Sequence, residues 1–457
     1  MYHLRTAGIG IAAVIVVSLL AGQVATHAAG PYEAEGLEPF DAGRFITPVV
    51  CGGCHAEIYG MWDGTMHSKA FDDPLFRAAS KSFLLDAENE GERADAEHCV
   101  ACHNPIAYRS GQIPGSSADY GNTTDVTKYA ISCDLCHSMS EIVELGNASF
   151  NTEPGNGSDD PGVKRGPRDD AEPLYHRAAY SEIHVSPEIC GSCHNVTHLS
   201  YGTQLEGTYD EWLESPYNAD DPSEKVVCQD CHMRQTKGNP ATGMTERPDY
   251  PGRASPMSRE RPHIYRHSVT GANAYLPQLL DVSGVAGLAL ERLTHAAVIE
   301  LHDIGSGPDG GWGFTVRVRN EGAGHLLPTG VSEYRQVWLE ITVTDANGSV
   351  VFSSGVPQET GALPDETVIF NTVFGDSGGN PTMNVARAAV VLHDRRVPPK
   401  GYLDQRFALP SAPASPCTVR AVLNYRSIDP AIARLLLGDD AAPVPVIPMA
   451  GIEETVR

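Results

Sequence analysis

The chain has only one long apolar segment. This run, Ala7–Ala21, follows the short basic start Met1–Arg5 and precedes the small residues Thr26–Ala29. The pattern predicts a signal peptide over residues 1–29, and no cysteine near the cleavage site indicates a lipoprotein anchor. An uncleaved membrane anchor is the alternative, although the run is shorter than the roughly 20 residues that span a bilayer. No later segment could span one, so we expect an exported protein, periplasmic or at the cell surface, with no transmembrane segment in the mature chain.

Basic residues are also scarce. The sequence has 33 Lys and Arg against 58 Asp and Glu, a formal charge of −25. A strongly acidic surface argues against nucleic acid or an anionic membrane as a partner. It is compatible with solubility at high salt or with a basic partner protein.

Cysteine is sparse but highly ordered. Ten of the eleven cysteines lie in five Cys-x-x-Cys-His motifs. This pentapeptide is the attachment site for c-type haem, in which two thiols bind the porphyrin covalently and the histidine becomes an axial ligand of the iron. The motifs therefore predict five covalent haems c, attached at Cys51 and Cys54, Cys99 and Cys102, Cys133 and Cys136, Cys190 and Cys193, and Cys228 and Cys231, with His55, His103, His137, His194 and His232 on the irons.

Zinc binding and disulfide bonding are the two alternatives for the cysteine pairs. Zinc ribbons separate their pairs by about 15–20 residues, whereas successive motifs here start at residues 51, 99, 133, 190 and 228. Zinc also does not need a histidine after every second cysteine. Five redox disulfides, each followed by histidine, are equally implausible.

The fold class expected from these patterns is α+β. Residues 30–289 have weak apolar periodicity and loops rich in Gly, Pro, Asp and Ser, such as Thr152–Pro173, so we expect a mostly helical, loop-rich pentahaem domain whose porphyrins form most of the core. Residues 290–438 are expected to form a β-sandwich and residues 439–457 a loosely packed tail.

The β-sandwich rests on short alternating segments separated by turn signals. Phe314–Val318 and Val337–Val343 alternate apolar and polar residues, and Asp345–Gly348 supplies a hairpin turn before Val350–Phe352. Ala388–Leu392 and Thr418–Tyr425 are expected to be further strands. The odd cysteine, Cys417, is in phase with the apolar residues of the last of these, so we expect a buried thiol without a cofactor.

The chain has 18 histidines, and this surplus fits two histidines on each iron. Methionine ligation, for example by Met61, Met66 or Met233, is the less favoured alternative. The preferred candidates for the second axial ligand lie in stretches with Gly or aromatic neighbours, where the chain can approach a porphyrin closely: His67, His176, His184, His267 and His325.

Several of these flanks resemble the cytochrome c554-like multihaem family, relatives of hydroxylamine oxidoreductase. The matching stretches are Cys51–His67 with Trp62, Thr208–Tyr217 running into Cys228–Met233, and Arg266–Gly271. The stretch Gly324–Gly330, with its β domain, resembles the extension of larger exported members. The resemblance implies electron transfer along a packed row of haems. Some relatives assemble at the cell surface into filaments and others are enzymes.

Electron transfer between redox partner proteins is therefore the favoured function, because paired histidines leave no iron open to substrate. The alternative is an oxidoreductase acting on a small nitrogen or sulfur compound at one five-coordinate haem. No motif carries lysine in place of histidine, and no catalytic residue stands out. A further hypothesis, compatible with the first, is that the β domain binds other copies of the chain in an oligomer or filament.

Overall fold

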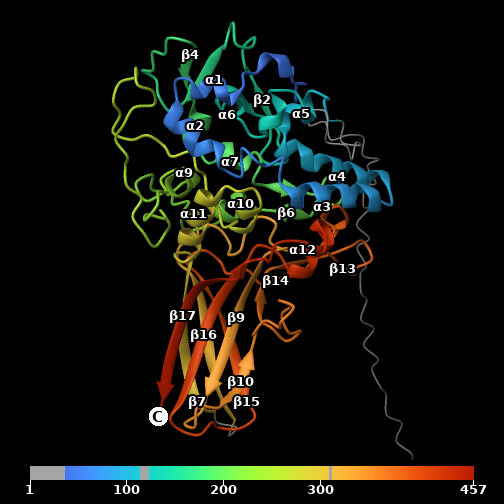
Figure 1. The fold of residues 1–457 in the computed structure, drawn as a ribbon, viewed down its shortest axis with the longest axis vertical. Helices are drawn as coiled ribbons and strands as arrows, with labels where there is room; N and C mark the ends of the chain where they lie inside the picture. The colour runs from blue at the N-terminus through green and yellow to red at the C-terminus, as the bar shows by residue number, and fades with distance from the viewer. Residues whose placement is uncertain (1–35, 114–122, 308–310) are drawn as a thin grey trace, which may run out of the picture.

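The computed structural model describes residues 36–113, 123–307 and 311–457 (Figure 1). The expected signal peptide lies outside the described residues. A helical, loop-rich part occupies one end of the molecule, and long strands extend from it to the C-terminus at the other end (Figure 1). The expectation of an α+β fold is confirmed.

The first part is built mainly of short helices. Its longest helices, α3 and α4, begin at side-chain caps, because Asp73 accepts from the Leu75 and Phe76 amides and Asn89 from the Glu92 amide. The α-helices are α1 Pro48–Gly52, α2 Ala56–Asp63, α3 Pro74–Asp86, α4 Glu90–His103, α5 Pro105–Arg109, α6 Cys133–Ser138, α7 Glu188–Gly191, α8 Thr208–Leu213, α9 Cys228–His232, α10 Tyr275–Leu279 and α11 Ser283–Leu293. The 3-10 turns here are Ala42–Arg44, Thr127–Tyr129 and Glu182–Val185.

Three small two-stranded sheets lie among these helices. They pair β1 Met139–Ile142 with β2 Phe150–Thr152, β3 Val163–Gly166 with β4 Arg177–Tyr180, and β5 Val196–Thr197 with β6 Gln204–Glu206. The β3–β4 pair is parallel. The stretch Thr152–Pro173, expected to be an exposed loop, thus contains strand β3, whose four residues are all half-buried.

The second part is dominated by two facing sheets. One has the order β10-β9-β16-β17 with β11 also on β9, and the other has the order β15-β8-β7. Alternate side chains of β8 and β9, including Val316 and Ile341, are fully buried in one shared apolar core, as a sandwich requires. The strands are β7 Ala297–Ser306, β8 Trp312–Asn320, β9 Gln336–Thr344, β10 Val350–Ser354, β11 Ile369–Phe370, β12 Thr372–Gly375, β13 Pro381–Thr382, β14 Val390–Asp394, β15 Tyr402–Leu409, β16 Cys417–Arg426 and β17 Ile447–Val456.

A third, smaller sheet of order β13-β12-β14 lies beside the sandwich, together with the 3-10 turn Val385–Arg387 and helix α12 Pro430–Leu437. The expected hairpin is present, since β9 pairs with β10 and Gly348 has a φ of +78° in the connecting turn. The strand expected at Ala388–Leu392 is found two residues later, as β14. Cys417 is 3% exposed within the core, as expected.

The loosely packed tail expected from residue 439 is corrected by the structure. Its second half is β17, which pairs antiparallel with β16 from Cys417↔Val456 to Tyr425↔Ile447. Ile447 and Met449 are buried in the sandwich core. The described residues include no helix long and apolar enough to cross a membrane.

Candidate functional site

One cavity of about 1430 Å³ runs through the helical part and reaches the β region. All ten motif cysteines, all five motif histidines and all five histidines predicted as second ligands line it. None of the eleven cysteines forms a disulfide bond. Within residues 36–113, 123–307 and 311–457, no group of three or more Cys, His, Asp and Glu side chains is arranged to hold a metal ion by itself.

Helices present the motifs to this cavity, four of them short and one, the second motif, at the end of α4. Helix α6 begins at Cys133 because Ser132 accepts a hydrogen bond from the Leu135 amide, and α9 begins at Cys228 because Asp230 accepts from the Val227 amide. One helical turn then places the second thiol near the first on the same face, with the histidine directly after it.

The five motif histidines share one hydrogen-bond pattern. Each Nδ1 lies next to an oxygen that can only accept, so each Nδ1 carries a proton, and in the neutral ring it is Nε2 that has the free lone pair. This is the tautomer that binds iron, and a fixed second partner is typical of metal-binding histidines. The acceptors are the carbonyls of Ala254 for His55 (2.7 Å), Ala70 for His103 (2.9 Å), Arg165 for His137 (2.7 Å) and Thr270 for His232 (2.9 Å), and the Glu206 carboxylate for His194 (3.0 Å).

His194 differs from the others because its acceptor is charged. Burial lowers the pKa of His194, but the hydrogen bond and charge of Glu206 outweigh burial and raise it to about 9. The same contact holds the pKa of Glu206 below its usual value against the opposing effect of burial. A carboxylate in this position raises the basicity of a ligating imidazole.

Four motif histidines face a second imidazole. With metal–nitrogen bonds of about 2 Å, two imidazoles on opposite sides of one metal have ring centres roughly 6 Å apart. Burial lowers the pKa of His67 and of His267 to about 4, so both are neutral and able to ligate. The pairs are His55–His176 at 6.3 Å, His67–His194 at 6.2 Å, His137–His267 at 6.3 Å and His232–His325 at 6.5 Å.

The structure thus brings four of the predicted second ligands, His67, His176, His267 and His325, opposite a motif histidine. His184 is placed differently. Its ring lies 5.6 Å from that of His137, but its Nε2 is 2.9 Å from the Cys136 carbonyl oxygen. Because His267 also faces His137, we leave His184 out of the proposed ligand set.

His103 has no such partner. In the part of the chain that the structure describes, no histidine ring lies opposite it at the spacing of the four pairs. Instead the Phe76 ring stacks on the His103 ring, with centroids 3.7 Å apart and planes 3° from parallel. The nearby His98 is directed elsewhere, with its Nε2 3.0 Å from the Asn147 carbonyl oxygen.

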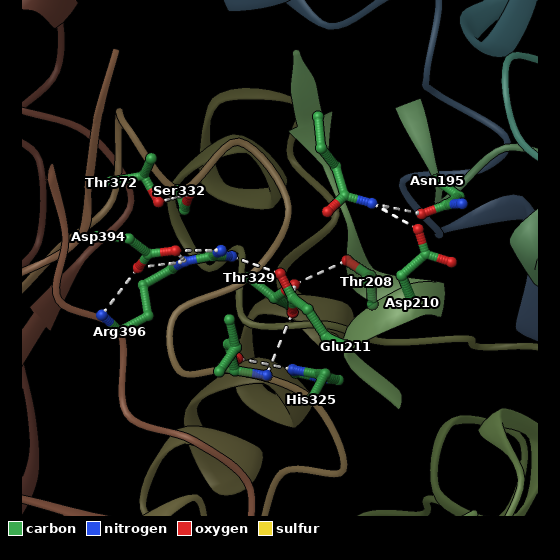
Figure 2. A network of polar contacts seen from close by, with 12 residues as sticks. Asn195, Thr208, Asp210, Glu211, His325, Thr329, Ser332, Thr372, Asp394 and Arg396 are labelled. Atoms are coloured by element: carbon green, nitrogen blue, oxygen red, sulfur yellow. Dashed lines mark hydrogen bonds and ion pairs between the residues drawn. The ribbon is translucent and has the colours of Figure 1, made fainter. Parts of the chain in front are cut away.

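The loop that carries His325 is held by a buried carboxylate of the helical part. Glu211 in α8 accepts from the Leu326 amide (3.2 Å) and the Thr329 hydroxyl (2.5 Å) and pairs with Arg396. Figure 2 shows these groups converging on Glu211 beside His325. Both the Glu211 and the Arg396 side chains are largely buried. This network fixes the β region against the cavity.

Sulfur atoms of different motifs also meet. Where cysteines of two motifs lie next to each other, the two haem-attachment motifs are neighbours in space. Three pairs of thiols lie close enough for each member to shift the pKa of the other: Cys51 with Cys133, Cys102 with Cys193, and Cys190 with Cys228. Cys193 also raises the pKa of Cys136 through its charge. The motif of His194 therefore adjoins the second motif through Cys193 and the fifth motif through Cys190.

Three features of the site had no signal in the sequence. Glu206 lies outside any motif, and only the short β5–β6 hairpin brings it to His194. Glu333 is a buried carboxyl, 4% exposed, that lines the same cavity. Phe76 lies in an ordinary amphipathic helix. A long-range contact positions each of the three.

Comparison with known proteins matches the cytochrome c554 and c-prime family over residues 50–138, which include the first three motifs. No curated protein matches the chain. The five motifs and this matched segment are similar to those of multihaem c-type cytochromes. Within that class, the resemblance to cytochrome c554 is confirmed over the matched segment.

Among solved structures, the chain is similar to a penta-haem cytochrome c552 from Thermochromatium tepidum, with a TM-score of 0.61 at 18% identity. The match covers 92% of this chain and 100% of that chain, and it shows a shared fold. A Northeast Structural Genomics Consortium target matches at 11% identity over 34% of this chain and 82% of that one, with a TM-score of 0.15 that carries no argument.

Proposed function

We propose that this chain carries electrons between redox partner proteins through five covalently bound haems c, one at each Cys-x-x-Cys-His motif. The observation that carries the proposal is the common state of the five motif histidines, each with Nδ1 donating to a fixed oxygen and Nε2 free. The likeness to a penta-haem cytochrome supports the count. When bound, haem supplies reversible one-electron chemistry at its iron.

The chain's own contribution is to fill axial positions and to set distances. His176, His67, His267 and His325 are proposed as the second ligands opposite His55, His194, His137 and His232. Three of these four donate Nδ1 to a backbone carbonyl and so present Nε2, as the motif histidines do: His176 to Arg177, His267 to Tyr265 and His325 to Leu326. Filled axial positions favour electron transfer over substrate chemistry.

The contacts between motif sulfurs support an order for electron transfer. Motif 1 adjoins motif 3 through Cys51 and Cys133, and motif 4 adjoins motif 5 through Cys190 and Cys228. Cys193 of motif 4 lies against Cys102 of motif 2 and acts on Cys136 of motif 3. We infer a row 1–3–4–5 in which motif 2 branches from motif 4.

A second candidate function is favoured by His103. Because no second imidazole faces it within the described residues, this motif is the one that could leave an iron open to a small nitrogen or sulfur compound. Such a site would be an oxidoreductase site supplied with electrons by the rest of the row. The two functions are compatible, since the branch at motif 2 does not interrupt the row.

We also propose that residues 1–29 direct export and are removed, and that the protein works in the periplasm or at the cell surface. Haem c is attached outside the cytoplasm, and the N-terminal pattern is that of a secretory signal. Whether copies associate stays a prediction of the sequence, tested by the size of the haem-loaded protein in solution.

The experiment that tests the proposal measures haem content and electron uptake on the same sample. Mass spectrometry of the mature protein is expected to show five haem additions, and stepwise reduction is expected to take five electrons per chain. Fewer than five haems in fully matured protein would overturn the count. Reduction of fully loaded protein that stops short of five electrons, or is irreversible, would overturn the electron-transfer role.

A further inference from the structure

The β region contributes a buried acid to the haem cavity in addition to His325. Glu333 lies on the loop between the His325 stretch and strand β9, and its side chain lines the cavity. It is 4% exposed, and neither carboxylate oxygen has a hydrogen-bond partner on another of the described residues. A buried carboxyl with no partner on another residue is costly as a charge, and that cost falls when a proton is bound.

The charged groups around Glu333 come from several elements. Arg335 follows it on the same loop, Arg396 comes from the loop after β14, and Glu206 comes from β6 in the helical part. The next residue, Tyr334, is turned away, with its hydroxyl donating to the Met383 carbonyl at 2.6 Å. Burial raises the pKa of Glu333 to about 8, against the hydrogen bond from its own backbone amide and the charges of the two arginines, which lower it, while Glu206 raises it further.

Glu206 joins this acid to the redox site. Its carboxylate accepts the His194 Nδ1 proton at 3.0 Å and acts electrostatically on Glu333. A change of charge at His194 therefore acts electrostatically on both Glu206 and Glu333. Removing one positive charge there makes the potential at Glu333 more negative, which favours binding of a proton.

We propose, on the basis of the proposed haem ligation, that Glu333 is a proton-binding site that takes up one proton when the iron at His194 gains one electron, and releases the proton on oxidation. The balance is one electron and one proton on each reduction, with the proton coming from solvent. No covalent bond other than the O–H bond of Glu333 forms or breaks. The β region then makes electron storage in this row sensitive to pH.

The sign follows from linkage. Protonated Glu333 favours the reduced state, so the potential of one redox step is expected to be highest at low pH, to fall as pH rises through the pKa of Glu333, and to level off above it. The sloping range lies around pH 8, where Glu333 titrates. The Glu206→Gln change removes a neighbouring negative charge and should move the sloping range to lower pH.

The test is a redox titration of the haem-loaded protein, followed by haem absorbance, at pH values on both sides of 8. Wild type should show one step with a falling potential, and Glu333→Gln should abolish the slope. The matched control is Glu366→Gln, an exposed acid of the β region, which should behave as wild type. A pH-independent wild type, or a slope that survives in Glu333→Gln, would overturn the proposal.

A second measurement keeps the proposal testable if Glu333→Gln fails to fold. The infrared difference spectrum of wild type, reduced minus oxidised, should contain the carbonyl band of a newly protonated carboxylic acid around pH 8. Absence of that band in fully haem-loaded protein would overturn the proton site. Missing haems would appear in the mass of the same sample, so failure of the proposed function is separately visible.

Discussion

Replacing His325 by alanine should open one iron and only one. His325 is the one proposed axial ligand supplied by the β region, and its ring lies 6.5 Å from that of His232. Removing the imidazole leaves the other three pairs untouched, since they draw on His176, His67 and His267. We therefore expect one additional open iron per chain, without a general loss of structure.

The magnitude follows from counting filled positions. The structure pairs four of the five motif histidines and leaves His103 without a partner among the described residues. Reduced wild type should therefore bind one carbon monoxide per chain, and His325→Ala should bind two. The measured quantity is the increment, read from haem absorbance on titration with the gas and normalised to haem content by mass.

The control is His302→Ala. His302 lies on β7, 41% exposed, with its Nε2 3.0 Å from Glu300, so it should change nothing at the haems. If His325→Ala binds no more carbon monoxide than wild type while retaining all its haems, His325 is an ordinary loop residue and the proposed ligand set is wrong. If wild type binds none, the open position at His103 is refuted, but the increment still tests His325.

Three further predictions concern the residues around the cavity and the sandwich core. Glu206→Gln should shift one redox step to higher potential, because the substitution removes the negative charge that makes His194 more basic. An unchanged titration curve would contradict this. Asp134, with a fully buried side chain, accepts from the Ile46 amide at 2.8 Å and pairs with Lys164, so Asp134→Ala should lower the free energy of unfolding by roughly 3–5 kcal/mol in a denaturant titration. Cys417→Ser should leave the haem spectrum intact and lower the free energy of unfolding by about 1–3 kcal/mol, because it buries a hydroxyl without a hydrogen-bond partner. Loss of a haem would show that Cys417 takes part in haem attachment.

The motifs and the alternating strands could be predicted from sequence because both are local patterns. The pairing of histidines could not. His67 follows the first motif closely, yet its ring faces His194 of the fourth, and His55 faces His176. Which histidine reaches which motif depends on how distant segments pack, and adjacency in sequence carries little information about that.

Strand β17 was missed for a different reason. The segment from residue 439 is rich in proline and alanine, a composition typical of loops. The strand nevertheless forms at the edge of its sheet, where Pro448 is tolerated because no further strand needs its amide, next to a register shift at Leu423/Asn424. Composition over the whole segment hid a ten-residue strand at its end.

The thiols of the fourth motif, Cys190 and Cys193, place that motif at the centre of the proposed electron path. In the row that we infer, the fourth motif is a junction with three arms, whereas the second motif ends a side branch. Loss of the second motif would remove a terminal and leave the through-route intact. Loss of the fourth motif would divide the path into three disconnected pieces. Electron transfer through the whole chain would therefore depend on the one motif whose histidine donates to a carboxylate.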